Sequence, residues 1–175
     1  MKKKYNKIGI LGGTFDPPHE GHLYISKIAL KKLKLNKLLW IVTKKNPLKN
    51  KPFLSQKKRI KLSKKITKNI KKIFVRDFES KVKSTTTFDL LSYMNKKYPK
   101  EEIFFVIGAD NLKKFHKWKS WKKIPSLAKI VVFPRNKYPI KSFNSKILKT
   151  LGKNDIIFIK ANKVNISSSL IRKFW

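Results

Sequence analysis

This chain is typical of an α/β protein in which a doubly wound parallel sheet carries helices on both faces. Two observations support that expectation. Short apolar runs of strand length recur along the sequence, and stretches with helical spacing separate them. Alternation of this kind is typical of βαβ units. With 175 residues and no internal repeat, the chain suits a single domain covering residues 1–175.

Six apolar runs have the length of strands and are rich in Ile, Val and Phe. Runs that are nearly continuous, rather than alternating with polar residues, are typical of strands buried on both faces of a parallel sheet. The six runs are Ile8–Leu11, Leu38–Val42, Ile73–Val75, Ile103–Ile107, Ile130–Phe133 and Ile156–Ile159.

Three stretches between these runs show helical spacing: His22–Leu33, Ser55–Ile70 and Phe88–Lys97. In the second stretch Ile60, Ile66 and Ile70 share one side and the lysines occupy the other, as in a helix packed on a sheet. Two further segments are predicted to be loops, Lys44–Lys51 and Pro134–Ser145.

The composition limits the class of protein. An apolar content of 41% supplies a core, and the absence of cysteine excludes disulfides and thiolate metal sites. The N-terminus is basic, but Ile8–Leu11 is too short for the apolar core of a signal peptide. No apolar run approaches the roughly 18 residues of a membrane helix. We expect a cytoplasmic protein with no membrane partner.

The net charge of +36 allows two interpretations. A strongly basic chain can bind nucleic acid or an anionic membrane surface. However, only four of the 45 basic residues are arginines, and Lys, Asn, Ile and Phe are all abundant, as AT-rich codons would produce. Proteins that grip DNA use more arginine, because its planar fork binds phosphate and guanine bidentately. We favour compositional drift, expect no specific nucleic-acid partner, and expect the charge to attract phosphorylated substrates.

A glycine-rich motif, Gly12–His22, follows the first predicted strand and precedes the first predicted helix. Gly12 and Gly13 would let the backbone turn and approach a ligand, and a helix N-terminus binds phosphate. His19 and His22 are three residues apart and can donate hydrogen bonds to phosphate oxygens from one helical face. The chain has only three histidines, so we favour phosphate binding over a simple turn with incidental histidines.

Other interpretations of this motif are excluded by its residues. No Gly-Lys-Ser/Thr ends it, so it is not a P-loop, and the G-x-G-x-x-G spacing of dinucleotide-binding folds is absent. Two histidines without nearby acidic ligands do not indicate zinc, and we expect no protein-bound metal.

A second motif lies near the C-terminus. Ser167 is a good N-cap for a final helix, with Ser168 and Ser169 in its first turn and Arg172 one turn on. Hydroxyls, N–H groups and a guanidinium arranged in this way can bind an anion. Plain helix capping explains the serines equally well.

Between these motifs, Ile103–Leu112 is predicted to be a strand that ends in a turn, where ligands of open parallel sheets bind. Trp118 and Trp121 follow it and could simply face the core. Arg135 ends another predicted strand, where it could reach either a phosphate or a surface carboxylate.

These motifs resemble those of one enzyme family. Gly12–His22 matches the G-G-T-F-D-P-x-H-x-G-H signature of the H-x-G-H nucleotidyltransferases, and Ile166–Arg172 is similar to their I-S-S-T-x-I-R element, with Ser169 replacing Thr. At the position of His19, pantetheine-phosphate adenylyltransferases usually have Thr, whereas nicotinate-nucleotide adenylyltransferases have His. The resemblance therefore implies a Rossmann-like nucleotidyltransferase fold that transfers adenylate from ATP to nicotinic acid mononucleotide, with nicotinamide mononucleotide as the alternative acceptor.

The resemblance also implies roles for single residues. His19, His22, Lys49 and Arg172 would act on the phosphates, with Mg²⁺ carried by those of ATP. ATP would also contact Gly12, Gly13, Thr14, Phe15, Gly108, Asp110, Ser167 and Ser168. The pyridine mononucleotide would contact Lys49, Thr87, Trp118, Lys119 and Arg135. Trp118 belongs to a segment similar to the family's F-x-x-W-x-x-W, and Thr87 and Asp89 match its Y-T-x-D segment.

Overall fold

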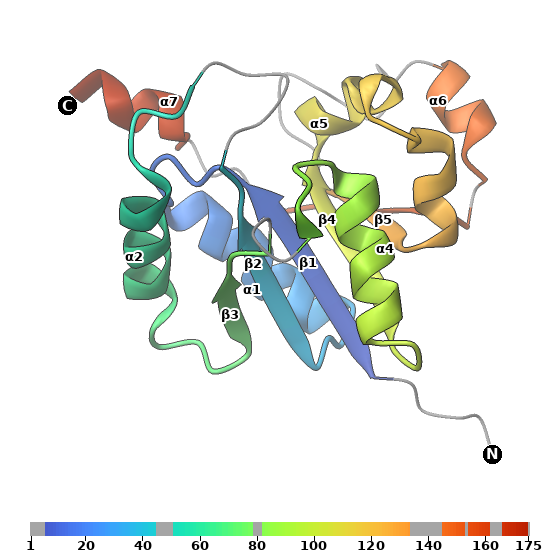
Figure 1. Cartoon of the computed structure of the whole chain (residues 1–175), viewed down its shortest axis with the longest axis horizontal. Helices are drawn as coiled ribbons and strands as arrows, with labels where there is room; N and C mark the ends of the chain where they lie inside the picture. The colour runs from blue at the N-terminus through green and yellow to red at the C-terminus, as the bar shows by residue number, and fades with distance from the viewer. Residues whose placement is uncertain are drawn as a thin grey trace.

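A parallel sheet of six strands, in the order β3-β2-β1-β4-β5-β6, forms the centre of the molecule (Figure 1). The computed structural model describes residues 6–44, 51–78, 82–133, 145–152, 154–161 and 166–174. The strands are β1 (Lys7–Gly13), β2 (Lys37–Val42), β3 (Ile73–Arg76), β4 (Glu102–Gly108), β5 (Lys129–Phe133) and β6 (Ile156–Phe158). All six predicted strands are therefore confirmed, and the chain order reverses between β1 and β4, as in a doubly wound sheet.

Helices cover both faces of the sheet. The α-helices are α1 (Glu20–Lys32), α2 (Gln56–Thr67), α4 (Thr87–Lys97), α5 (Ala109–Lys113), α6 (Ser145–Thr150) and α7 (Ser168–Ile171). Three short 3₁₀ helices are η1 (Phe115–Lys117), η2 (Trp121–Ser126) and η4 (Arg172–Phe174). The three long predicted helices are confirmed. The single-turn elements α5, η1 and η2 were not predicted, because they are too short to show a helical period, and α6 begins at Ser145, inside a predicted loop.

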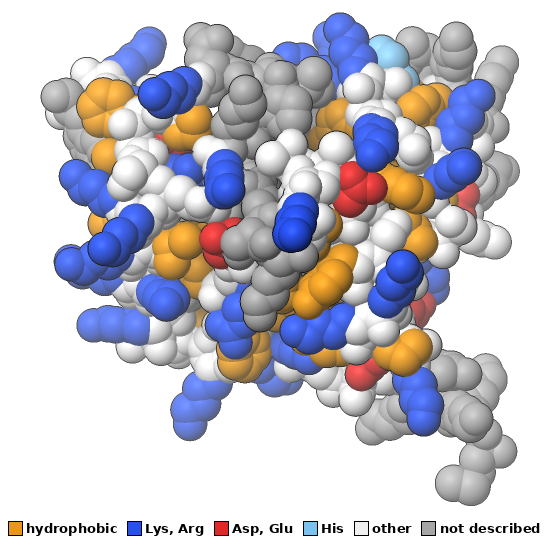
Figure 2. All heavy atoms as spheres, viewed as in Figure 1, with side chains coloured by type: hydrophobic (Ala, Val, Ile, Leu, Met, Phe, Trp, Pro, Cys, Tyr) orange, Lys and Arg blue, Asp and Glu red, His pale blue; other side chains and the backbone are white. Residues whose placement is uncertain are grey.

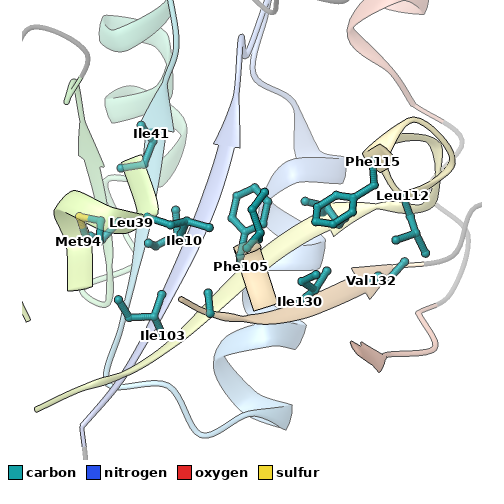
Figure 3. Close-up of a cluster of buried hydrophobic side chains, with 14 of the residues drawn as sticks. Ile10, Leu39, Ile41, Met94, Ile103, Phe105, Leu112, Phe115, Ile130 and Val132 are labelled. Atoms are coloured by element: carbon teal, nitrogen blue, oxygen red, sulfur yellow. The ribbon is translucent and has the colours of Figure 1, made fainter. Parts of the chain in front are cut away.

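Two hydrophobic clusters, one on each face, fill the space between sheet and helices. The first joins strand residues such as Ile10 and Phe105 to Met94 of α4 and Phe115 of η1 (Figure 3). The second joins strand residues such as Trp40 to α1, with partly buried isoleucines of α2 against it. Because successive strand residues alternate between the clusters, the nearly continuous apolar runs are explained by burial on both faces.

Close packing at the second cluster requires a glycine in β1. A Cβ atom at Gly9 would lie 2.4 Å from Leu38 Cδ1 and 2.6 Å from Leu35 Cδ1. Carbon atoms in contact are normally 3.5–4.0 Å apart, so a side chain at this position would require Leu35 and Leu38 to shift.

The buried side of α2 carries polar residues beside the predicted isoleucines. Arg59, Ser63 and Thr67 are buried, and Ile60 and Ile66 are partly buried against the second cluster. The three polar residues are four apart and so share one face. Arg59 can be buried because its guanidinium donates to several backbone carbonyls, and the Thr67 hydroxyl donates to the Ser63 carbonyl at 2.8 Å.

Basic side chains are spread over the visible face of the molecule, over α2 as well as α4, rather than gathered into one stripe (Figure 2). Among the described residues, no helix is long and apolar enough to cross a bilayer.

Candidate active site

The turn between β1 and α1 is built differently from the expected glycine turn. Gly12 and Gly13 belong to β1, and neither has a positive φ. The left-handed residue is Phe15, with φ of 48°, an uncommon conformation for a residue with a side chain. Its buried ring stacks on Trp40 with centroids 4.7 Å apart, and this packing holds the backbone in place. Gly12 and Gly13 instead line a cavity, described below, where they contribute backbone but no side chain.

The two motif histidines together cap the N-terminus of α1. Nδ1 of His19 accepts from the N–H of Gly21 at 3.1 Å, and Nδ1 of His22 accepts from the N–H of His19 at 3.3 Å. Their ring centroids are 3.8 Å apart. An imidazole that accepts through Nδ1 carries its proton on Nε2 when neutral, so both rings are fixed in the tautomer with an Nε2–H donor.

Neighbouring residues lock both imidazoles. A Cβ atom at Gly21 would lie 2.9 Å from the His19 ring, so only glycine leaves room for that ring. Behind His22, the Trp40 indole donates to Ser26 Oγ at 2.8 Å, and Ser26 donates to the His22 carbonyl at 2.7 Å. This chain of hydrogen bonds fixes the first turn of α1 against the sheet.

The C-terminal motif packs directly on the same turn. Ser167 caps α7 by accepting from the N–H of Leu170, and the Ser168 hydroxyl donates to the Pro17 carbonyl at 2.8 Å. Arg172 donates to the Asp16 carbonyl and lies 3.7 Å from the Asp16 carboxylate. The structure therefore brings together two motifs from opposite ends of the chain.

Two residues that organise this region were not predicted from sequence. The buried Asp16 carboxylate accepts from the N–H groups of Phe53 and Leu54 at 2.7 and 2.9 Å, and so holds the entry to α2 against the turn. Arg59 donates to the carbonyls of Thr14, Thr43 and Lys44, just after β1 and β2, and to that of Leu54 before α2. The available signal for Arg59 was its rarity, since an arginine among lysines indicates a need for several directed donors.

A cavity of about 230 Å³ opens at the carboxyl ends of β1, β2 and β4. One part of the lining is the N-terminus of α4 with the residues before it, and another is the segment Lys117–Lys119. The cavity is lined by the predicted residues Gly12, Gly13, Thr87, Trp118 and Lys119, and also by Thr43, Ser84, Thr86, Asn111 and Lys117, among others.

Trp118 both packs on the core and lines the cavity. Its ring lies 5.1 Å from Phe115 and 6.0 Å from Phe105, centroid to centroid, and so packs on the core. It is also part of the cavity lining. Trp121, in contrast, packs on Phe115 at 6.1 Å and is absent from that lining.

A polar cluster stabilises the start of α4. Thr86 caps the helix, and one oxygen of Asp89 accepts from Ser84 at 2.6 Å, from Thr86 at 2.8 Å and from Lys119 at 3.2 Å. The hydrogen bonds from Ser84 and Thr86, followed by Lys119, hold the pKa of the Asp89 carboxyl below its ordinary value of 3.8. Lys119, predicted to bind substrate, thus has its ammonium paired within the protein.

Two further predicted residues lie where β4 meets α5. Gly108 ends β4 and precedes α5, and Asp110 stands in the first turn of α5. Lys49 and Arg135 lie outside the described residues. Within the described ranges, no group of three or more His, Asp or Glu side chains is placed to hold a metal ion.

A doubly wound sheet whose first strand leads into paired histidines on a helix N-terminus defines a nucleotidyltransferase-type site. Comparison with known proteins agrees. The model of the cytidylyltransferase-like family matches residues 10–174. A relative from Pelagibacter ubique, named as a probable nicotinate-nucleotide adenylyltransferase, is 49% identical over 99% of this chain and 96% of its own length. A relative of the same name from Clostridium tetani is 36% identical over 99% of this chain and 86% of its own.

Solved structures show the same fold. Nicotinic acid mononucleotide adenylyltransferase of Plasmodium falciparum in complex with NaAD superposes with a TM-score of 0.81 at 24% identity, covering 97% of this chain and 84% of that one. Its complex with APC gives a TM-score of 0.76 at 26% identity over the same shares of the two chains. The chain therefore belongs to the cytidylyltransferase-like family, and within it to the nicotinate-nucleotide adenylyltransferases.

Proposed function

We propose that this protein transfers the adenylyl group of ATP to nicotinic acid mononucleotide, giving nicotinic acid adenine dinucleotide and pyrophosphate in NAD biosynthesis. The proposal rests on two features that lie at the two ends of one short segment of chain. Two histidines with fixed Nε2–H donors cap α1, and β1 connects them to a cavity with Trp118 on one wall and a helix N-terminus on the other. Phosphates suit the first place, and an aromatic anion suits the second.

The reaction is an in-line displacement at the α-phosphorus of ATP. The 5′-phosphate oxygen of the mononucleotide forms the new P–O bond while the bond to the bridging oxygen breaks and pyrophosphate leaves. A phosphate monoester is already anionic at neutral pH, so the nucleophile requires no general base. Catalysis then consists of positioning and of neutralising the charge that develops on the phosphates.

The paired histidines are the catalytic donors in this proposal. Because each Nδ1 accepts a backbone N–H, each neutral ring offers Nε2–H to a phosphate oxygen, and the helix N-terminus adds its own positive potential. His22 is assigned to the bridge between the α- and β-phosphates and His19 to the neighbouring oxygens. The substrate is MgATP, with the ion on the β- and γ-phosphates.

Other residues hold the two substrates. Ser168 and Arg172, anchored on Pro17 and Asp16, stand beside the α1 N-terminus and are assigned to the triphosphate, together with Lys49. The adenosine is assigned to Gly108 and Asp110, at the carboxyl end of β4 beyond the switch in strand order. Arg135 is proposed as a further phosphate contact.

The acceptor pocket favours a carboxylate over an amide. Lys117 lines the cavity beside Trp118, and the first-turn N–H groups of α4 point along a helix axis whose N-terminal end is positive. Asp89, two residues after Thr87 of the cavity lining, already accepts three side-chain donors. A pocket with donors for a charged group discriminates against a ligand that leaves those donors unsatisfied.

Pyrophosphate release from MgATP with a panel of acceptors tests the proposal. We expect nicotinic acid mononucleotide to give a kcat/KM at least about tenfold above nicotinamide mononucleotide, or roughly 1.4 kcal/mol in transition-state binding. Phosphopantetheine should be inactive. Equal use of the two mononucleotides would reject the carboxylate pocket. If no mononucleotide supported pyrophosphate release, the proposed function would be rejected.

A further inference from the structure

The cavity has two walls that are far apart in sequence. The α4 wall consists of residues 84–87, and the Trp118 wall consists of residues 117–119; both line the cavity. A side-chain ion pair joins them, with Lys119 Nζ lying 3.2 Å from Asp89 Oδ2 across 30 positions of sequence. Lys119 is part of the lining, whereas Asp89 is not.

The carboxylate end of this pair is rigid. Ser84 and Thr86 donate to the same Asp89 oxygen, and the Thr86 hydroxyl accepts in turn from the N–H of Asp89. The Asp89 side chain is 27% exposed, against 59% for Lys119. The Asp89 carboxylate is therefore held in place on α4, and the more exposed Lys119 side chain pairs with it from the other segment of the lining.

The Trp118 wall needs such an attachment. The Trp118 ring is fixed by Phe115 and Phe105, but the chain beyond it is exposed at Lys119 and turns through a left-handed Ser120 with φ of 51°. A residue with a side chain adopts this conformation at a cost, and it persists only where the surroundings impose it. Backbone hydrogen bonds from Trp121 N–H to the Trp118 carbonyl and from Lys123 N–H to the Ser120 carbonyl hold this turn, and Lys119 joins it to α4.

We propose that Asp89 and Lys119 are positioning residues that clamp the two walls of the acceptor pocket, setting the gap between Trp118 and the first turn of α4. Lys119 then acts through its pair with Asp89, not as a direct ligand of the acceptor. The identity of the acceptor rests on the proposed function, whereas the clamp itself is a property of the protein without ligands.

Loosening the clamp should weaken binding of the mononucleotide and leave ATP binding unchanged. Asp89→Asn keeps an oxygen that can accept from Ser84 and Thr86 but removes the charge. Lys119→Gln removes the other partner from an exposed position. Partly exposed ion pairs are weak, so we expect KM for the mononucleotide to rise about 1.5-fold to fivefold in each variant. The double variant should be no worse than either single one, because both remove the same interaction.

Glu102→Gln is the matched control. Glu102 pairs with Lys129 and Lys7 at the amino ends of the strands, away from the site. The variant therefore loses a comparable surface ion pair without changing the site. Hydrogen exchange of the protein without substrate gives a second measurement. Asp89→Asn and Lys119→Gln should exchange faster than wild type at residues 118–121, and Glu102→Gln should not.

The outcomes separate the clamp from the proposed function. If wild type turns over no mononucleotide, the function fails, and hydrogen exchange still tests the clamp. Unchanged exchange in both variants, or an equal rise in KM for ATP and mononucleotide, would overturn the clamp. A rise in the mononucleotide KM alone, with faster exchange at residues 118–121, would support it.

Discussion

The two ends of the candidate site are stabilised in different ways. At the phosphate end, buried side chains hold the backbone: Phe15 stacks on Trp40, Asp16 accepts two backbone N–H groups, and His19 caps α1 while 5% exposed. At the acceptor end, the exposed ion pair between Asp89 and Lys119 connects α4 to the segment around Trp118, and both segments contribute to the cavity lining. Buried hydrogen bonds are costly to break, whereas exposed ion pairs are weak. Substitutions should therefore have large effects at the phosphate end and graded effects at the acceptor end.

The largest expected effect is at His22. Removing one preorganised donor to a developing anion typically lowers a rate by about 10²–10³. His22→Ala should fold and lose that factor in kcat. His116→Ala is the control, because it removes the remaining histidine, which is exposed on η1. Steady-state pyrophosphate release measures both, and a kcat for His22→Ala close to that of wild type would show that the phosphate end lies elsewhere.

Sequence reasoning performed differently at the two ends. At the phosphate end both motifs were predicted, because a glycine pair, two spaced histidines and a serine-rich cap are local patterns. Their mutual contact through Asp16 and Arg172 is long-range, and the sequence alone shows only that both motifs exist. Likewise Phe15, not a glycine, adopts the left-handed conformation, since tertiary packing on Trp40 overrides local preference.

At the acceptor end, Trp118 and Thr87 were predicted through resemblance, and both line the cavity. The partner of Lys119 was not predicted, because in a chain with 45 basic residues no single lysine is distinguished by type. Arg59 illustrates the same limit: apolar periodicity identified the isoleucines that pack on the core, but it gave no sign of the arginine buried beside them by its hydrogen bonds.

The next effect in size concerns stability at the phosphate end. Arg59→Met keeps much of the side-chain volume but removes every donor to the carbonyls at the ends of β1 and β2. Hydrogen bonds from charged groups contribute about 1.5–3 kcal/mol, and neutral acceptors left buried add a penalty. We expect the free energy of unfolding in urea to fall by about 3 kcal/mol.

Lys58→Met is the control for Arg59→Met, because Lys58 is the exposed neighbour on the same helix. Its free energy of unfolding should change by less than about 0.5 kcal/mol. Equal losses in the two variants would mean that the guanidinium does not support the phosphate end through its carbonyl contacts.

The smallest expected effect is the pH dependence of the acceptor end. Hydrogen bonds from Ser84 and Thr86, with Lys119, lower the pKa of Asp89 in the folded protein below 3.8, while the unfolded chain keeps the ordinary value. The ionised carboxylate therefore stabilises the fold above the unfolded pKa, and this contribution is lost as pH falls through the folded pKa. The Tm difference between wild type and Asp89→Asn should be constant above about pH 5 and shrink below about pH 4. Thermal scans at matched ionic strength from neutral to acidic pH measure it, and a difference that grows on acidification would mean that the protonated carboxyl, not the carboxylate, holds the start of α4.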